Sequence, residues 1–266
     1  MSLALFTISQ DETDALQLWL AHHRAHAPTA ELYVLDHESA GDAALVLQDE
    51  QANGVTVVPV RHDVSFDYDW LTRTVEDFAG FLLRSYAAVG FAEVDELLLP
   101  TAASTLEALL LTTTEPFVRA EGRCLVHHHP EEPPLRLDQP LLAQRRHWYR
   151  SERYSKICLF RERVYWKNGF HAAYNVPATQ HATPALINLH LHQADYAQAL
   201  RRHQRNAGRR WDPRFRQSDL GVHQRLDNPD ELARYLLANL DRPREYAELE
   251  EIPAAYQESY RVCLPR

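Results

Sequence analysis

Segments with strand-like and helix-like character alternate through the first hundred residues, and this alternation constrains the fold more than any other feature. Parallel strands joined by helical crossovers are built from segments in this order. The alternation therefore predicts an α/β fold with a mostly parallel, Rossmann-like sheet flanked by helices. We expect strands over 3–9, 31–37, 54–60 and 91–99, and helices after Ser9, over 43–53 and over 70–86.

The helical segments are predicted from capping signals and from the spacing of apolar residues. Ser9 and Glu12 have the spacing of a capping box ahead of the first helix. Between Leu71 and Leu82, apolar residues recur at spacings of four, three and four, which places them on one helical face.

The sequence after Pro100 alternates less regularly, so we expect a less regular C-terminal part. Prolines deny the backbone both helical and ladder hydrogen bonds, which makes the proline-rich stretch 129–140 a loop. The other segments are predicted as a helix near 104–111, a strand over 123–129, a hairpin over 154–171, a strand over 184–193, and helices over 195–206 and 228–240.

Composition excludes several classes of protein. The length of 266 residues suits one large domain or a domain with appendages, and the net charge of -9 argues against a general nucleic-acid binder. The three cysteines are widely spaced and form no CxxC pair, so they predict neither a disulfide framework nor a zinc knuckle. The sequence shows no basic leader and no apolar run near the roughly 20 residues that span a bilayer. We expect a cytoplasmic protein without a transmembrane segment.

The segment FAEVDELLLP, residues 91–100, places three carboxylates in an apolar run that has the character of a buried strand. A carboxylate left unpaired in a dry interior costs several kcal/mol or takes up a proton. In an extended chain Glu93 and Asp95 point to one face and Glu96 to the other. Two carboxylates on one face are half of a cation site. The alternative is a strand end whose acids are solvated or salt-bridged.

Four stretches in order carry a resemblance to a known family. They are SQDETDALQLWLAHHRAHAPTAELYVLDHES, FAEVDELLLP, QPLLAQRRHWYRSERYSKICLFRERVYWKNGFH and LINLHLHQADYAQALRR. Together they resemble the nucleotide-sugar glycosyltransferases of the GT-A fold, in the broad family 2 group. The resemblance implies that residues 1–100 form a nucleotide-sugar-binding half ending in the metal motif. It implies that residues 101–266 form an acceptor-side half of the same compact domain, with C-terminal helices.

The resemblance assigns roles to residues at the strand ends. Asp11 and Glu12 occupy the place of an Asn-Glu pair that starts the first helix in that group, and Asp36 ends the second strand. This implies that Glu12 and Asp36 contact the nucleotide, since nucleotides bind beyond the carboxyl ends of the strands. The alternative for Asp11 and Glu12 is a helix N-terminus that favours acidic residues.

The same resemblance implies a divalent cation bound by an E-x-D motif, Glu93 and Asp95, and by the two phosphates. Glu93 replaces the usual Asp and is one methylene longer. Such a cation acts as Lewis acid and template. Oxygen ligands with an added imidazole favour Mn²⁺ or Mg²⁺. His171 is the first choice for the imidazole, and His190 and His192, which share a strand face, are the reserve.

Two lysines occur in the whole chain, Lys156 and Lys167, and both lie in the third resembling stretch. A retained lysine in an arginine-rich chain fits a site that needs a compact ammonium, such as a diphosphate. Chance is the alternative.

The proline-rich loop supplies three candidates for a catalytic base, Glu131, Glu132 and Asp138, which an inverting enzyme needs on its acceptor side. Acids in such loops are usually just solvated. The stretch 201–217 concentrates seven arginines with Trp211 interleaved. It is either a solvated helix face or a patch that steers an anionic or membrane-bound acceptor.

The sequence thus predicts a glycosyltransferase that moves a sugar from a UDP- or GDP-type donor to an unknown acceptor, which is a glycan, a lipid-linked molecule or a small molecule. One alternative is a GT-A-like module that binds a nucleotide-sugar or a partner without turnover, which the replacement at Glu93 favours. A second is a metal-dependent hydrolase using His190 and His192, although the close-set histidine motifs of that class are missing.

Overall fold

A computed structural model describes residues 2–177, 180–217, 221, 226, 228, 230–231, 234–235, 249–260 and 264. The strands are β1 (Leu3–Ser9), β2 (Glu31–Asp36), β3 (Thr56–Pro59), β4 (Ala88–Phe91), β5 (Glu96–Pro100), β6 (Phe117–Val126), β7 (His147–Arg150), β8 (Ile157–Phe160), β9 (Thr183–His190) and β10 (Leu249–Glu251). The helices are α1 (Thr13–His26), α2 (Gly41–Ala52), α3 (Tyr68–Leu82), α4 (Leu106–Thr112), α5 (Tyr196–Ala207), α6 (Pro213–Arg216) and α8 (Ala254–Ser259). Two short 3-10 turns are η1 (Leu141–Gln144) and η2 (Glu152–Tyr154).

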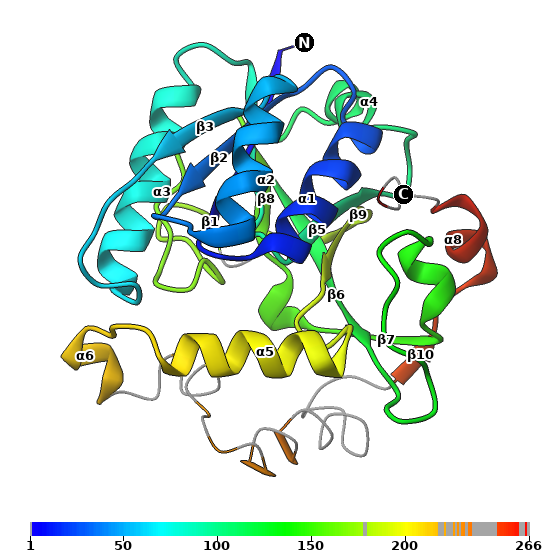
Figure 1. The fold of residues 1–266 in the computed structure, drawn as a ribbon. Coiled ribbons are helices and arrows are strands. Elements are labelled where there is room, and N and C mark those ends of the chain that lie inside the picture. Colours follow the sequence, from blue (N-terminus) through cyan, green and yellow to red (C-terminus); the bar gives the residue numbers. More distant parts are fainter. Residues whose placement is uncertain are drawn as a thin grey trace.

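The strands form one ten-stranded sheet with helices packed on both faces (Figure 1). Its main path is β10-β7-β6-β8-β4-β1-β2-β3, and β9 pairs with both β5 and β6 beside this path. Strands β3, β2, β1 and β4 are parallel, whereas β8 is antiparallel to both β4 and β6. The predicted α/β class, with parallel strands flanked by helices, is confirmed.

Strand β1 shows why the helices divide between the two faces. Leu3 and Leu5 pack in the core cluster that contains the buried residues of α1 and α2, while Ala4 and Phe6 pack in the cluster that contains those of α3. This follows from the alternation of side chains along a strand. Asp67 caps α3 by accepting from the backbone N–H groups of residues 69 and 70, at 3.1 Å each.

The predicted capping box at the start of α1 is wrong. Ser9 is the last residue of β1 and is buried, and Glu12 makes no side-chain hydrogen bond to the helix N-terminus. The Glu12 carboxylate instead pairs with Arg202 and Arg205 from α5. Glu12 therefore forms long-range ion pairs with α5, and its side chain does not cap α1.

The single strand predicted over 91–99 is also wrong. The chain leaves β4 at Phe91, turns through residues 92–95, and enters β5 at Glu96. Strand β4 pairs with β1, whereas β5 pairs antiparallel with β9. Glu93 and Asp95 consequently lie in a turn, where the alternation of an extended strand does not apply.

The second half of the chain departs most from the prediction. The hairpin expected over 154–171 is wrong, because β8 pairs with β4 and β6, and the following residues form one isolated bridge, Trp166 with Ala173. The helix expected over 228–240 falls largely outside the described residues. Among the described helices, none combines the length and apolar character needed to cross a membrane.

Candidate functional site

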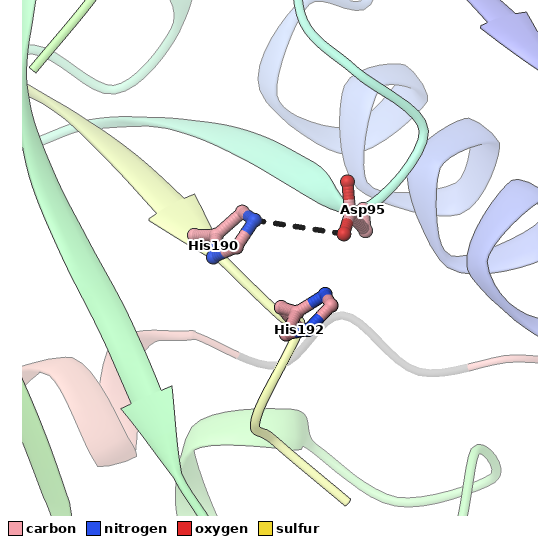
Figure 2. A group of neighbouring side chains, drawn as sticks. All are labelled: Asp95, His190 and His192. Atoms are coloured by element: carbon pink, nitrogen blue, oxygen red, sulfur yellow. Dashed lines mark ion pairs between the residues drawn. The ribbon is translucent and has the colours of Figure 1, made fainter. Parts of the chain in front are cut away.

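Three side chains that can bind a metal ion converge where β5 begins and β9 ends (Figure 2). They are Asp95, from the turn before β5, His190, the last residue of β9, and His192, two residues later. One ligand atom from each lies within 4.8 Å of the others, and His190 Nε2 is 3.6 Å from Asp95 Oδ2.

Strand pairing brings these residues together. Glu96 is the direct partner of His190 in the antiparallel ladder of β5 and β9, and Leu191 N–H donates to the Asp95 carbonyl oxygen at 2.8 Å. The turn itself is closed by the Glu96 N–H, which donates to the Glu93 carbonyl oxygen at 2.8 Å. The backbone therefore holds Asp95 beside the end of β9 independently of any ion.

The two imidazoles are buried, and burial favours their neutral form. Burial is the main cause that lowers the pKa of His190, and burial together with His203 lowers the pKa of His192 well below its usual value. The His190 ring stacks on Tyr154 with ring centroids 3.9 Å apart, and His203 Nε2 lies 3.1 Å from His192 Nε2. Neutral imidazole is the form that binds metals, and such outer contacts orient the ligand rings.

These donors fit a divalent cation. Metal–ligand bonds of roughly 2.0–2.2 Å place neighbouring ligand atoms about 3–3.5 Å apart, close to the 3.6 Å between His190 Nε2 and Asp95 Oδ2. Two imidazoles with one carboxylate suit Mn²⁺ better than Mg²⁺, which prefers oxygen ligands throughout.

Arg202 from α5 also contacts Asp95. Its Nη1 donates to Asp95 Oδ2 at 2.6 Å, and its Nε donates to Glu12 Oε2 at 3.2 Å. Burial is the largest single influence and opposes the charge on Asp95, but Arg202, the two histidines and Lys156 together outweigh it and lower the pKa of that carboxyl far below its usual value. Asp95 is therefore ionised at neutral pH, as a metal ligand must be.

Lys156 binds the other two carboxylates of the segment. Its buried ammonium pairs with Glu93 and lies 2.7 Å from Glu96 Oε1. Burial disfavours this charge, but the two carboxylates outweigh it and raise the pKa of Lys156. Glu93 thus faces an ammonium, and it is not a member of the three-residue metal group.

Two small cavities meet at these residues. The first, of about 140 Å³, lies beyond the end of β1 and is lined by Glu12, Phe66, Arg202 and Arg209 among others. The second, of about 80 Å³, is lined by Tyr68, Tyr154, Arg153, Gly169, Gly221, His171 and His190. Glu93, Asp95 and His192 line both cavities, so the metal group stands between them.

His171 lines the second cavity, but it does not belong to the group formed by Asp95, His190 and His192. Its Nδ1 is 2.8 Å from the carbonyl oxygen of Arg153, and burial lowers its pKa to about 2. His190 and His192 are the histidines gathered with Asp95.

Asp36 and Lys167 lie apart from both cavities among the residues that the structure describes. Asp36 ends β2 and accepts the Ser39 N–H at 2.9 Å, closing a local turn. Lys167 is exposed, with its ammonium 5.3 Å from the centroid of the Tyr174 ring.

The three acids of the proline-rich loop are not brought to the metal group either, within the described ranges. Glu132 is buried and accepts the N–H groups of His128 and Arg146, at 2.9 and 3.0 Å. Asp138 pairs with Arg136 at 3.0 Å, and Glu131 is exposed. Glu132 therefore has a structural role in organising the loop.

The seven arginines of the stretch 201–217 divide into two sets: three turn toward acids near the site, and Arg201, Arg210, Arg214 and Arg216 are exposed. Arg202 and Arg205 turn toward Glu12, and Arg209 Nη2 lies 3.0 Å from Asp11 Oδ2. Beyond the helix, Trp211 stacks on Phe66 with centroids 3.9 Å apart. Asp11 and Glu12, after β1, and Asp95, after β4, therefore pair with Arg202, Arg205 and Arg209.

Arg202 and Tyr154 are the site residues that sequence reasoning missed. The available signal for Arg202 was its place at the end of the stretch LINLHLHQADYAQALRR, where a strand runs into a helix. Tyr154 gave no signal, because it belongs to a 3-10 turn whose position against β9 depends on distant pairing.

Comparisons with known proteins do not identify a family. No protein-family model matches the sequence, and no curated protein matches it. A crystal structure of an active-site mutant of LgtC aligns with a TM-score of 0.29 and 14% sequence identity, over 46% of this chain and 46% of that chain. At that TM-score the likeness supports no conclusion about this protein.

Proposed function

We propose that this protein is a glycosyltransferase that moves a sugar from a UDP- or GDP-type nucleotide-sugar to an acceptor, with a divalent cation held by Asp95, His190 and His192. The observation that carries the proposal is the convergence of these three residues between two cavities. The resemblance of four stretches to GT-A glycosyltransferases supports the reaction class.

The topology supports a nucleotide at this edge of the sheet. Strand β1 lies between β2 and β4, and the helices that follow β1 and precede β4 pack on opposite faces. Such a switch point opens a crevice at the carboxyl ends of the strands, where ligands bind in α/β sheets. Glu12 follows β1 and Asp95 follows β4, so both lie at this crevice.

Several residues have roles that the geometry suggests. When bound, a divalent cation supplies charge stabilisation to the departing diphosphate. His203 orients His192, and Arg202 and Arg209 line the first cavity, where guanidinium groups suit phosphate oxygens. We assign the transferred sugar to the second cavity, lined by Arg153 and His171, whose volume of about 80 Å³ requires lining side chains to move before it can enclose a sugar. Mn²⁺ is preferred to Mg²⁺ here, because Mg²⁺ takes oxygen ligands throughout.

The test is calorimetric titration of UDP and GDP with and without Mn²⁺, followed by a donor-hydrolysis assay with a set of nucleotide-sugars. We expect one nucleotide to bind at least tenfold more tightly with Mn²⁺, and slow hydrolysis of the matching donor. Nucleotide binding without hydrolysis or transfer would instead favour a binding module. No binding of either nucleotide at millimolar concentration would overturn the proposal.

A metal-dependent hydrolase is the second candidate, because two imidazoles and one carboxylate are a common donor set for hydrolytic metals. It predicts hydrolysis of phosphate or acyl esters that lack a nucleotide. A panel of chromogenic esters with Zn²⁺ and Mn²⁺, with Asp95→Ala as control, separates the two candidates.

A further inference from the structure

We propose that Arg202 couples cation binding to nucleotide binding: it holds Asp95 in the nucleotide-free protein, and it turns to the diphosphate when the nucleotide binds. This inference rests on the proposed function and adds a residue that determines the order of ligand binding. Helix α5, which carries Arg202, crosses below the edge of the sheet at which β1 ends (Figure 1).

Arg202 and the cation need the same oxygen of Asp95. Arg202 Nη1 donates to Asp95 Oδ2 at 2.6 Å, and that same Oδ2 is the atom 3.6 Å from His190 Nε2. A cation bound to Oδ2 at roughly 2.2 Å would stand within about 5 Å of the guanidinium nitrogen. Two positive charges at this separation repel, so Arg202 and the cation compete for Asp95.

Water screens the repulsion between Arg202 and the cation only weakly. The side chains of Arg202 and Asp95 are 16% and 14% exposed. Interactions between partly buried charges are screened less than those on the surface. Displacement of Arg202 from Asp95 consequently requires another group to accept its hydrogen bonds.

Arg202 has a second hydrogen-bond partner besides Asp95. Its Nε donates to Glu12 Oε2 at 3.2 Å, while Nη1 alone faces Asp95. The side chain can therefore release Asp95 and keep its bond to Glu12, which leaves Nη1 available for a phosphate oxygen. Planar guanidinium groups bind phosphate well, and Arg202 lines the first cavity together with Arg209.

The size of the first cavity agrees with such a rearrangement. Its volume of about 140 Å³ is below the roughly 300 Å³ at which small-molecule sites begin. A nucleotide enclosed within this cavity would require lining side chains to move, and Arg202 is a lining residue that bridges the two sides of the crevice.

Arg205 provides a matched control. It lies one turn further along α5 and pairs with Glu12, but within the described part of the chain no contact joins it to Asp95. The substitutions Arg202→Gln and Arg205→Gln remove the same charge from the same helix. Arg202→Lys is a third variant, which keeps the charge without the planar fork.

The experiment measures free Mn²⁺ by electron paramagnetic resonance during titration of the full chain, with and without UDP or GDP, corrected for Mn²⁺ bound by the nucleotide in solution. For the wild type we expect weak Mn²⁺ binding that the nucleotide strengthens at least tenfold. For Arg202→Gln we expect at least tenfold tighter Mn²⁺ binding without nucleotide and a smaller effect of the nucleotide. Arg205→Gln should stay within threefold of the wild type, whereas Arg202→Lys should keep the weak Mn²⁺ binding without nucleotide but show a smaller effect of the nucleotide, because it lacks the planar fork.

Other results separate failure of this inference from failure of the proposed function. If Arg202→Gln and wild type bind Mn²⁺ equally while the nucleotide still strengthens binding, Arg202 does not compete and the inference is overturned. The same holds if Arg205→Gln matches Arg202→Gln, since general charge would then explain both. If neither Mn²⁺ nor a nucleotide binds to any variant, the proposed function fails as well. Circular dichroism at each titration temperature verifies that every variant is folded.

Discussion

Glu96 and His190 are direct partners in the antiparallel pair of β5 and β9, and this pairing places the preceding residue, Asp95, beside the His190 ring. A shift of the register by one residue would turn the His190 side chain to the other face of the sheet. The candidate metal group is therefore a consequence of strand register, and its residues can be tested one at a time.

Substitution Asp95→Ala should abolish Mn²⁺-dependent nucleotide binding, with a loss of at least hundredfold, while the protein stays folded. Asp95 supplies the carboxylate of the metal group, and its backbone contact to Leu191 N–H does not involve the side chain. Arg202 would keep its bond to Glu12. Calorimetry with nucleotide and Mn²⁺ measures the loss, and wild-type affinity in the variant would exclude Asp95 as a ligand.

Replacement His203→Ala should weaken Mn²⁺ binding about tenfold, because outer contacts that orient ligand histidines typically contribute 10- to 100-fold in affinity. His203 Nε2 lies 3.1 Å from His192 Nε2, and both residues are buried. The Mn²⁺ titration described above provides the measurement. Unchanged affinity would show that His192 is held by other contacts or is not a ligand.

The two lysines of the chain offer a paired test of stability. Lys156 is buried between Glu93 and Glu96, so Lys156→Met leaves two carboxylates without their counter-charge. Removing one partner of a buried ion pair costs about 3–5 kcal/mol of unfolding free energy. Lys167→Met, at an exposed position, should change it by less than about 0.5 kcal/mol. Urea unfolding of both variants measures the difference, and equal values would contradict the assigned role of Lys156.

Much of the parallel half of the fold could be predicted, because its signals are local. The periods of two and 3.6 in segments such as 31–37 and 70–86 identify strands and helices without knowledge of their partners. Strands β7 and β10 pair with each other across about a hundred residues of sequence, and neither was predicted. Their existence depends on partners that no local pattern reveals.

The candidate site was only partly accessible from sequence for the same reason. The sequence alone shows three acids at 93–96 within an apolar run, and one of them, Asp95, belongs to the candidate site. The sequence did not reveal their geometry, because the chain turns between β4 and β5. Lys156, the residue that precedes β8, pairs with Glu93 and Glu96. Arg202 reaches Asp95 only because α5 folds back against the crevice.

Stability should fall as the pH drops below about 6.5, because buried histidines of α1 stay neutral in the folded protein. Burial is the largest cause that lowers the pKa of His23 to about 3 and the pKa of His22 well below its usual value. The unfolded chain, with an ordinary histidine pKa near 6.5, then binds more protons than the folded one. Each such histidine therefore removes about 1 kcal/mol of unfolding free energy between pH 6 and pH 5.

The variant His23→Gln tests this proton count. Below pH 6 the variant should take up about one proton fewer on unfolding than the wild type. The slope of its unfolding free energy against pH should be smaller by the corresponding amount, whatever the effect of the substitution on stability at pH 8. His181→Gln, at an exposed position, is the matched control and should leave the slope unchanged. Urea unfolding at several pH values gives both slopes, and equal slopes for the two variants would contradict a neutral His23.

Two neighbouring arginines beyond α5 differ in their exposure to solvent. Arg209 lines the first cavity and donates to the Gln10 carbonyl oxygen at 2.5 Å, whereas Arg210 is exposed, with Nη1 3.5 Å from the Asp63 carbonyl oxygen. A cationic group at the cavity favours a diphosphate, and an exposed one is screened by salt. Arg209→Gln should therefore lower nucleotide affinity about tenfold, and Arg210→Gln should leave it unchanged at physiological ionic strength. If the two variants lose affinity equally, and only at low salt, the arginines act through long-range attraction and the nucleotide does not contact Arg209.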